Sequence, residues 1–559
     1  MTHLAFFIAV VATSLLWSAT MTAAATRVQR PWLQQLLITL AVIAPALALA
    51  PWLAGSFMLA FAAKLQVNWF AAVVTAFLST VIGGGWIVRA GLRPTVIGLA
   101  IPTAVQWPLV GLVAAFLLAK SVAAGTLLTL DKGVTSMIPS MKAEAVELLQ
   151  ANLPPVVSDT ANAAPLYQAA FAALDADPVA GAPDSPLDTS STVDVQDAAV
   201  ADLVARHSET LSLLREAAGR DVCRFTRDWT RPSLDMLIPE MQSVRQAARL
   251  VQLAARRKAT TGDIAGALTD IAVLHRIGQH AAAEPILISG LVGVAIDTMA
   301  LDTLAQVLPK LDSSDLERLD APAIRDLVHI VPSFKRHFFG EEAFGTMMFA
   351  SLCDGRSAMD SFDLLASIEG SSGPAPALWR TPLKPLIGTL FRVFLLPEDF
   401  RAYRSTLRAY QQLLAVPKSF TDSTREAKAI EDSLNNDRRG ILTSMLAPAL
   451  SSCIRTGVRS QALHRAAAVA VAATRHRIEK GSLPESLDDL VPAFLPFAPA
   501  DPFADNVPLR LTQTDSGLVI YSVGPDREDD GGPAAPGTET PGGNDDVGLR
   551  IVHSSARTQ

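Results

Sequence analysis

The sequence from Leu33 to Ala63 is LQQLLITLAVIAPALALAPWLAGSFMLAFAA, a run without a single charged side chain. A helix needs roughly 20 apolar residues to cross a hydrocarbon core about 30 Å thick. Uncharged runs of that length also occupy residues 4–25, 65–88 and 94–119. We therefore predict that residues 1–130 form a four-helix transmembrane region with these four spans.

The distribution of charge separates this region from the rest of the chain. Residues 1–130 contain no Asp or Glu and only six of the 47 Lys and Arg residues, so residues 131–559 carry 41 basic side chains against all 54 acidic ones. Six of the eight Trp residues also lie in the first region, mostly near span ends, where an amphipathic indole prefers the headgroup layer. The lipid bilayer is thus the expected partner of residues 1–130.

The first run, residues 4–25, has a second interpretation as a cleaved signal peptide, because the small residues Ala23–Ala25 precede Thr26. We favour a span, because the residues before the run include no Lys or Arg. The run is also longer than a typical signal-peptide core.

The basic residues of the short loops predict the orientation of the spans. Arg27 and Arg30 lie between the first two spans, and Arg89 and Arg93 lie between the last two, whereas the middle loop carries only Lys64. Cytoplasmic loops are enriched in Lys and Arg. With four spans, the large acidic region is then expected outside the cytoplasm, anchored in the inner membrane of a bacterium; a different span count would invert this orientation.

The predicted spans carry no ionisable side chain away from their ends. Ion-coupled transporters place such groups at membrane depth despite a cost of at least about 2.5 kcal/mol each. The pattern therefore favours an anchor. The alternative, a transport or signalling component, rests on the few amide side chains of the region, which are Gln34, Gln35, Gln66, Asn68 and Gln106.

Residues 131–459 are expected to form an α-helical soluble domain. Apolar residues recur there at three- and four-residue spacing in the segments 140–151, 163–174, 197–218, 233–258, 263–282 and 286–308. Residues 175–196 are rich in Asp, Pro, Ser and Gly, which predicts a flexible, solvated linker or a long loop. A second such stretch is residues 369–376.

One hairpin within this domain resembles half of a tetratricopeptide repeat. The sequence Gly262-Asp-Ile-Ala-Gly-Ala-Leu268 follows one predicted helix and opens the next, as the turn and second helix of such a repeat do. No 34-residue period recurs. The resemblance implies a helical hairpin with a surface for a protein partner.

A further apolar run is a candidate for a fifth span. It covers residues 379–397, WRTPLKPLIGTLFRVFLLP. Lys384 and Arg392 interrupt a run that is already short for a bilayer. We therefore expect a buried helix or one that lies along the membrane surface.

Residue types that support catalysis or metal binding occur without a recognised pattern. Cys223, Cys353 and Cys453 form no CxxC pair, so free buried thiols are expected. His275 and His280 would lie about 140° apart on a helix, unlike the pair of a zinc-binding helix. The net negative charge of the region also disfavours nucleic acid as a partner.

Glu341 and Glu342 are the most evident carboxylate pair. Adjacent helical residues point about 100° apart, so the two do not make an acid and base dyad. We expect them at a helix start, near the positive end of its dipole. No Walker loop, GxSxG or Rossmann fingerprint is present. An unrecognised active site in the helical domain, built from Glu341, Glu342, His337 and Asp228, remains the enzymatic alternative.

The last hundred residues predict a small α+β domain over 460–559. An Ala-rich helix over 460–480 ends at Gly481, and a short helix covers 483–490. Strand-like runs follow at 507–512 and 518–523, joined by a hairpin turn, and at 547–552.

Several motifs of this domain resemble a known family in their order along the chain. They are G481-x-L-P-E-S-L-D-D-L490, Asp501-Pro-Phe503, Tyr521-Ser-Val-Gly-Pro-Asp526 and Asp529-Asp-Gly-Gly532. In this order they look like the globular domain of type II secretion pseudopilins of the G kind, over about residues 460–552. The prepilin-peptidase site and the single Glu-bearing helix of that family are not matched, and Arg527 stands where the family usually has Gly.

The resemblance implies a bound calcium ion, since the matching segments surround calcium in that family. Oxygen ligands suit calcium, which takes six to eight of them. The candidate ligands are Asp501, Asp526, Asp529 and Asp530, with Asn544, Asp545 and Asp546 as further contributors. The alternative is a solvated acidic loop.

These observations predict a mainly α protein of the bacterial envelope. It is expected to be non-enzymatic, anchored by four spans, and to present a helical body and a pseudopilin-like domain to a protein partner outside the cytoplasm.

Overall fold

The computed structural model describes residues 16–17, 19–34, 36–38, 40, 125–182, 185–188, 192–229, 238–353, 391–416, 418–436, 441–505, 507–534 and 545–552. The chain divides into two units, of which one comprises Met1–Gly133 with Ala366–Val393 and the other Val134–Leu365 with Phe394–Gln559. Each is described by itself.

Little of the predicted transmembrane region lies among the described residues. Residues 19–27 and 31–34 are helical. The spans predicted at 65–88 and 94–119, most of the other two, and residues 379–390 lie outside the described part. In that part, one helix, Leu287–Lys310, is long and apolar enough to cross a membrane, and 67% of its apolar window is buried within the protein. Such burial is typical of a core helix.

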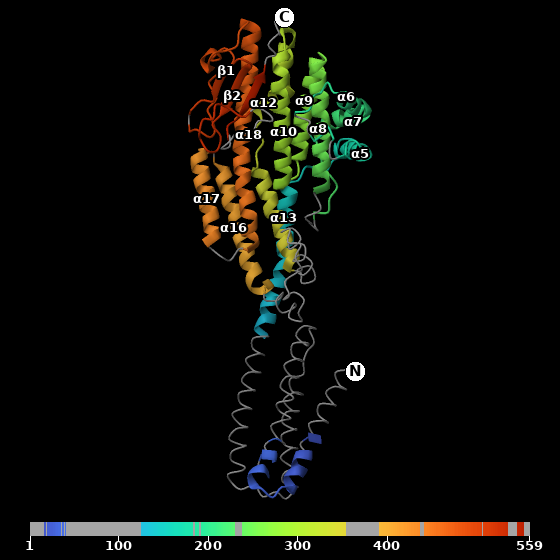
Figure 1. Cartoon of the computed structure of the whole chain (residues 1–559), viewed down its shortest axis with the longest axis vertical. Coiled ribbons are helices and arrows are strands. Elements are labelled where there is room, and N and C mark those ends of the chain that lie inside the picture. The colour runs from blue at the N-terminus through green and yellow to red at the C-terminus, as the bar shows by residue number, and fades with distance from the viewer. Residues whose placement is uncertain are drawn as a thin grey trace. The chain divides into compact units, whose positions relative to one another are not determined.

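The second unit is mainly helical, which confirms the prediction of a mainly α protein. Its centre is formed by α8 (Ile238–Thr260), α9 (Ile264–Ala281), α10 (Leu287–Val307) and α18 (Ile441–Lys480). Figure 1 shows α8, α9 and α10 side by side with α18 next to α10. The helices predicted over 263–282 and 286–308 are confirmed as α9 and α10, and α8 corresponds to the prediction over 233–258 where it is described. The helix predicted over 460–480 is the second half of the longer α18.

The α8–α9 hairpin follows from two residues. Gly262 has a φ of 89°, the left-handed conformation that favours glycine. Asp263 then caps α9, because its side chain accepts a hydrogen bond from the Gly266 N–H at 2.9 Å. The turn predicted from this sequence is therefore present.

Smaller helices surround the centre. They are α5 (Ala164–Asp175), α6 (Ala198–Arg206), α7 (Ser208–Ala218), α11 (Leu316–Leu319), α12 (Pro322–His329), α13 (Lys335–Cys353), α16 (Leu396–Ala415) and α17 (Phe420–Asn436). Residues 125–152 form a further helix, a π-helical turn covers Phe391–Leu395, and short 3₁₀ turns cover Leu308–Lys310, Ser313–Asp315 and Leu487–Asp489.

The single helix expected over 197–218 is in fact two, α6 and α7. The break is at His207, whose backbone leaves the helical region with φ −94° and ψ 24°. Its ring contacts Asp177 Oδ2 at 2.9 Å and Thr210 Oγ1 at 3.2 Å. A buried side chain with two polar partners thus interrupts a segment whose apolar spacing continues.

Residues 175–196 form a packed loop where they are described. Leu187 is 1% exposed and belongs to the main hydrophobic core together with Ala180 and Val195. Arg249 also pairs with Asp188 at 2.7 Å. Side chains buried within a polar sequence therefore hold this segment on the helical body.

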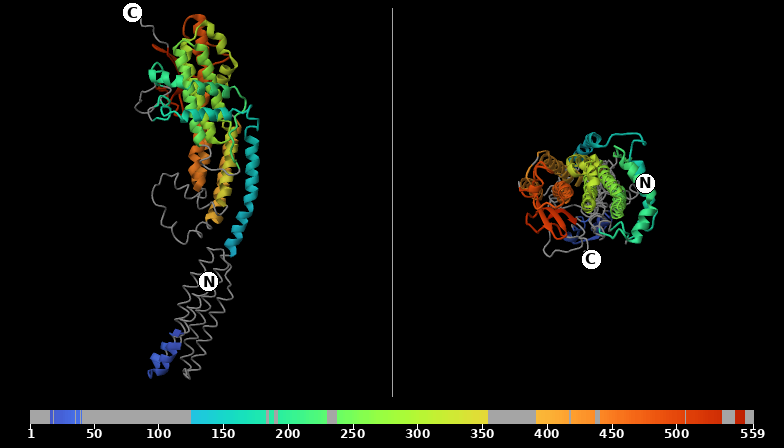
Figure 2. Two further views of the ribbon diagram at one scale, coloured as in Figure 1. Left: turned by 90° about the vertical axis from the view of Figure 1, so that its right-hand side faces the viewer. Right: turned by 90° about the horizontal axis from the view of Figure 1, so that it is seen from above.

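The three strands form one antiparallel sheet in the order β1 (Arg510–Thr514), β2 (Gly517–Ser522), β3 (Val547–Val552). The hairpin register pairs Thr514 with Gly517, as the turn composition predicts. The sheet packs on α18 and α10. Figures 1 and 2 show it on one side of the central helices, with α5–α7 on the other side.

The expected boundary between body and C-terminal domain, at residues 459 and 460, lies in the middle of α18. Ala466, Ala470 and Ala473 of this helix share one hydrophobic core with Ile520 of the sheet and with Ile296 of α10. The small alanine side chains allow the sheet and α10 to pack closely against α18.

Candidate functional site

A cavity of about 210 Å³ lies between α9, α10 and the start of α13. Polar side chains line it from the α9–α10 wall and from the start of α13, and Gly and apolar residues complete the lining. The lining residues are His275, Gly278, Gln279, Ala282, Gly290, Gly293, Val294, Asp297, Ile330, Pro332, Ser333, Phe334, Arg336 and His337. A concave site with apolar walls and a few convergent polar groups is the usual form of a ligand pocket.

Glycines bring the two helices together beside the cavity. A Cβ atom on Gly293 would lie 2.7 Å from the carbonyl oxygen of Gly278 and 2.7 Å from the Cβ of Ala282. Real Cβ atoms do not approach other atoms so closely, so this crossing of α9 and α10 requires glycine at position 293.

Asp297 is the centre of a buried polar cluster on one wall. His275 Nδ1 lies 2.5 Å from its Oδ1, and His464 Nε2 of α18 lies 2.9 Å from its Oδ2. The three side chains are each at most 6% exposed. Burial by itself would raise the pKa of Asp297, but the hydrogen bonds and charges of the two histidines hold that pKa below its ordinary value.

Both histidine rings also contact groups other than Asp297. His464 Nδ1 donates to the Ser460 carbonyl oxygen at 2.7 Å. The Gln279 amide donates to His275 Nε2 at 2.8 Å, so that nitrogen carries the lone pair. His275 Nδ1 therefore donates to Asp297 Oδ1.

His280 does not join this cluster, as its spacing from His275 predicts. Tyr167 donates its hydroxyl proton to His280 Nδ1 at 2.9 Å, and His280 Nε2 donates to the Arg220 carbonyl oxygen at 3.1 Å. Burial lowers the pKa of His280 to about 4, so the ring is neutral at physiological pH.

The opposite wall of the cavity is the first turn of α13. Arg336 and His337 both donate to the Ala282 carbonyl oxygen, His337 through Nε2 at 2.9 Å. Burial lowers the pKa of His337 to about 4. Desolvation lowers the pKa of Arg336, although this residue is exposed.

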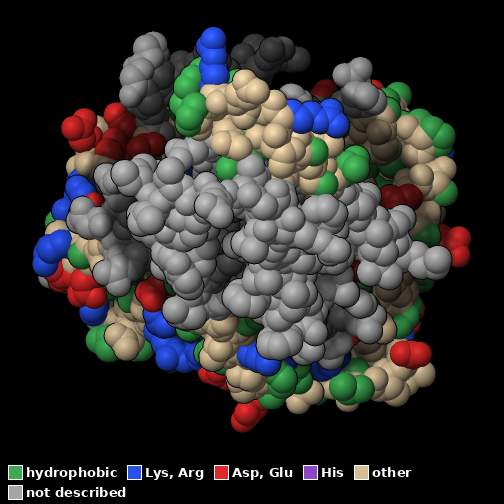
Figure 3. Space-filling model, turned by 90° about the horizontal axis from the view of Figure 1, so that it is seen from below, with side chains coloured by type: hydrophobic (Ala, Val, Ile, Leu, Met, Phe, Trp, Pro, Cys, Tyr) green, Lys and Arg blue, Asp and Glu red, His purple; other side chains and the backbone are tan. Residues whose placement is uncertain are grey.

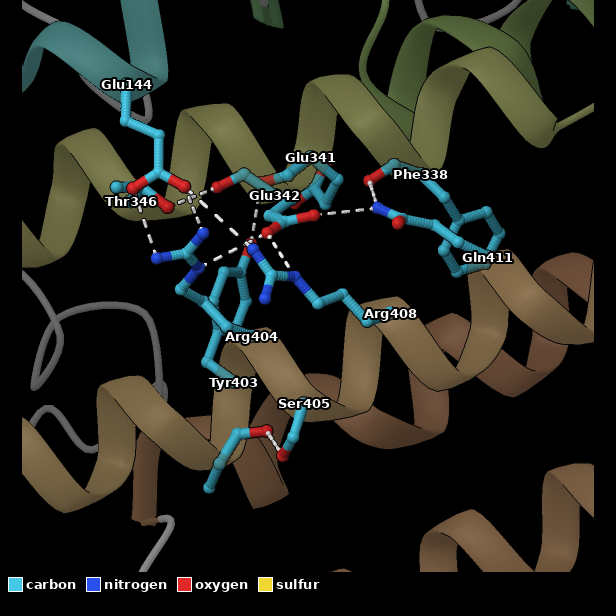
Figure 4. Close-up of polar contacts among 11 residues, drawn as sticks. Glu144, Phe338, Glu341, Glu342, Thr346, Tyr403, Arg404, Ser405, Arg408 and Gln411 are labelled. Carbon is cyan, nitrogen blue, oxygen red and sulfur yellow. Dashed lines mark hydrogen bonds and ion pairs between the residues drawn. The ribbon is translucent and has the colours of Figure 1, made fainter. Parts of the chain in front are cut away.

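Glu341 and Glu342 point to different partners, as expected for adjacent helical residues. Glu341 Oε2 accepts from the Leu287 N–H at 3.2 Å. Glu342 accepts from Arg404, Arg408 and Gln411 of α16, as Figure 4 shows. Their expected place at a helix start is wrong, because α13 begins at Lys335 and both residues lie in its second turn.

Arg404 continues this network to the helix over 125–152. Its guanidinium binds Glu342 Oε1 at 3.2 Å and also the Glu144 carboxylate (Figure 4). Apolar contacts support the same junction, since Leu149 packs in one cluster with Phe344 of α13. The cluster is thus built to join three helices.

The four residues of the enzymatic alternative are not brought together. His337 binds the Ala282 carbonyl, Glu341 binds a backbone N–H, and Glu342 binds arginines. Asp228 is exposed. The three cysteines are buried thiols, as expected.

The candidate calcium ligands have protein partners where they are described. Asp501 is buried and accepts from Ser522 Oγ at 2.5 Å and from the Val523 N–H at 3.0 Å. Asp529 Oδ2 pairs with Arg510 Nε at 2.7 Å. Asp526 and Asp530 are exposed, and Asn544 lies outside the described residues.

Asp546, a further contributor, is buried, and its Oδ2 accepts from the backbone N–H groups of Asp530 and Gly532 at 3.1 and 2.7 Å. Among the described residues, no group of three or more His, Cys, Asp or Glu side chains has the geometry of a metal site.

Comparison of the chain with protein-family models, with curated proteins and with solved structures gives no match. The candidate site is therefore argued from the geometry of this chain.

Asp297 and His464 are not among the functional residues predicted from the sequence. Asp297 lies in a mainly apolar helix, where a buried acidic residue is a signal for a buried partner. His464 lies in the Ala-rich helix without a neighbouring charge pattern that points to Asp297.

Proposed function

We propose that this chain is a non-enzymatic, membrane-anchored protein of the bacterial envelope. Residues 1–130 form the anchor in the inner membrane, and the helical body binds a protein partner outside the cytoplasm. The observation that carries the proposal is the segregation of charge, with no carboxylate in residues 1–130 and all 54 in the remainder.

The helix over 125–152 supports the anchor. It follows the last predicted span, and its first turns expose large apolar side chains. Leu128 is 52% exposed and Leu130 is 42% exposed. Apolar side chains on such a helix are suited to the edge of a lipid layer.

The hydrogen-bond and ion-pair partners of the acidic side chains support a binding role. The carboxylates with catalytic potential, Glu341 and Glu342, bind separate structural partners. Large apolar side chains such as Phe497, 68% exposed, and Val416, 58% exposed, are available to a partner. In the described part of the face in Figure 3, basic and acidic side chains are interspersed, which suits a protein surface more than a polyanion.

The C-terminal α+β arrangement supports the pseudopilin-like proposal. A long helix, α18, packs on a three-stranded antiparallel sheet. Arg527 has a φ of 67°, so the backbone keeps a glycine-like conformation where the family usually has Gly. Calcium binding by Asp526, Asp529, Asp530 and Asp501 is part of this proposal.

Topology is tested with reporter fusions in the full chain after Gly133. A periplasmic reporter such as alkaline phosphatase is expected to be active there, and a fusion after Arg30 is expected to be inactive. Activity with the reverse pattern would overturn the location of the body.

Calcium is tested on the purified full-length protein in detergent. The thermal midpoint is expected to rise in millimolar CaCl₂ and to return with EGTA, because an ion that binds only the folded state stabilises it. Asp530→Asn should remove the effect. An equal midpoint in all buffers would remove calcium from the proposal without affecting the anchor.

A further inference from the structure

Two large apolar side chains are exposed next to each other where α16 begins. Phe394 is 52% exposed and Leu395 is 45% exposed, and both belong to the π-helical turn Phe391–Leu395. Single apolar side chains scattered over a surface are usual in soluble proteins, whereas adjacent large ones form a patch that marks an interaction site.

The helical body does not cover these two side chains. Its contact with α16 is made by Leu396, Phe400 and Tyr403, which are at most 9% exposed. Helical residues three and four positions apart share one face, so these three form a continuous buried stripe. Phe394 and Leu395 lie outside that stripe, and whatever covers them is not the core of the body.

Arg392 connects this turn to the helix that follows the last predicted span. Its guanidinium binds the carboxylate of Asp131, the first acidic residue of the sequence. The helix over 125–152 exposes Leu128 and Leu130 immediately before that residue. Phe394 follows Arg392 by two residues, so the two Cα atoms lie within about 8 Å of each other. The exposed patch is therefore close to the end of the proposed membrane anchor.

The charged side chains around the patch favour contact with the apolar part of a lipid layer. Arg392 binds Asp131, and Arg401 binds Glu398. The π-helical turn itself contains no acidic residue. Exposed aromatic and aliphatic side chains of a membrane-surface segment lie at the boundary between headgroups and acyl chains. Because both arginines already have a carboxylate partner, attraction to anionic headgroups is not needed for this contact.

The rest of α16 leads away from the predicted span. Arg404 lies further along α16 than the patch, and it binds Glu144, which lies further along the helix over 125–152 than Asp131. The two segments therefore run in the same direction. With a rise of about 1.5 Å per residue, the 20 residues of α16 extend about 30 Å. Val416, directly after α16, is thus far from the patch.

We propose that Phe394 and Leu395 insert into the boundary between headgroups and acyl chains of the bilayer. They form a second membrane contact, outside residues 1–130, that holds the start of α16 at the membrane surface. This inference rests on the proposed anchor and goes beyond it, because it assigns lipid as the partner of a segment of the helical body.

The test is site-directed spin labelling of the full-length protein in phosphatidylcholine vesicles. Phe394→Cys and Leu395→Cys are each labelled with a nitroxide, and Val416→Cys is the matched control, because Val416 is 58% exposed and lies at the other end of the same helix. Oxygen concentrates in lipid and a nickel chelate in water, so the ratio of their effects on nitroxide relaxation reports the surroundings. The wild-type protein, with three buried thiols, gives the labelling background.

We expect the ratio of oxygen to nickel accessibility to be several-fold higher for the labels at Phe394 and Leu395 than for the label at Val416. The first two labels should lie about 5–10 Å inside the headgroup boundary. The ratios should be the same in vesicles that also contain phosphatidylglycerol, because the contact depends on apolar side chains. The thermal midpoint of each variant in detergent shows whether it is folded.

Water-like values for both labels in folded variants would overturn the proposal. Spin–spin broadening between labels at Phe394 would also overturn it, because a second copy of the chain would then cover the patch. Lipid exposure that appears only with phosphatidylglycerol would overturn the apolar mode of contact.

A fourth position separates this inference from the anchor on which it rests. Leu40, which is 38% exposed, lies in the predicted span 33–63. If the label of Leu40→Cys is in lipid while those at Phe394 and Leu395 are in water, only the second contact is rejected. Water-like values at all four positions would reject the anchor as well.

Discussion

Nδ1 of His275 lies 2.5 Å from Oδ1 of Asp297, and this contact joins α9 to α10 inside the hydrophobic core. His464 adds α18 to the same carboxylate. One acidic side chain of α10 therefore connects three of the four central helices.

Asp297→Asn is expected to destabilise the protein by about 1–3 kcal/mol, because it removes the buried carboxylate that both His275 and His464 contact. The measurement is thermal unfolding of the full-length protein in detergent, followed by circular dichroism. Asp326→Asn, on an exposed position of α12, is the control and should change stability little. A similar midpoint for both variants would contradict the role of Asp297.

Acidification is expected to destabilise the fold through His280 and His337. Both have a pKa of about 4 in the folded protein against an ordinary value of 6.5, because burial disfavours the charged ring. The unfolded chain thus binds more protons between these values, so stability is complete above pH 6.5 and decreases as the pH falls towards 4. The double variant His280→Gln, His337→Gln should show a flatter profile of midpoint against pH. His329→Gln, at an exposed position, should retain the wild-type slope.

Two glutamates that bind Arg404 should differ in how much each stabilises the fold. Glu342 is 4% exposed and pairs with Arg404 and Arg408, so Glu342→Gln is expected to cost about 3 kcal/mol. The Glu144 side chain is 52% exposed, so Glu144→Gln should cost less than about 1 kcal/mol. The thermal unfolding midpoints of the two variants are compared with that of the wild-type protein. A larger decrease in the midpoint for Glu144→Gln than for Glu342→Gln would contradict this prediction.

Gly293→Ala should disturb the crossing of α9 and α10. The added methyl would lie 2.7 Å from the Gly278 carbonyl oxygen, and such overpacking costs about 1–3 kcal/mol. Gly133→Ala is the matched control, because no atom lies within 4 Å of its added methyl and alanine favours a helix by up to about 1 kcal/mol. The two substitutions should therefore shift the melting temperature in opposite directions.

The strain of the left-handed backbone at Arg527 is tested by two substitutions that remove its side chain. Arg527→Gly and Arg527→Ala both remove the contacts with Thr421 and the Phe420 ring. At φ 67°, glycine is expected to be about 1 kcal/mol more stable than alanine. Equal stability in thermal unfolding would show that the conformation is not strained.

Helices and turns could be predicted where local rules decide them. Gly262 with Asp263, and Gly481 with a φ of 80°, mark helix ends because glycine tolerates left-handed backbone and aspartate caps a helix. The break at His207 could not be predicted, because it depends on Asp177, which contacts the ring only in the folded chain.

The candidate site could be predicted only in its parts. The basic run Lys335–His337 is visible in the sequence, but the cavity beside it requires the approach of α9 and α10 to the start of α13. Likewise, His275 acquires a role from Asp297 and His464, which lie on other helices. Long-range packing, which local spacing does not encode, assembles these groups.

The length of α18 has a consequence for how the protein unfolds. This helix of 40 residues supplies His464 to the helical body and Ala466 to the core that includes the sheet. Loss of the sheet therefore uncovers part of the surface on which α10 packs, and loss of α10 uncovers the inner face of the sheet. We expect the body and the C-terminal strands to melt together in a single cooperative transition.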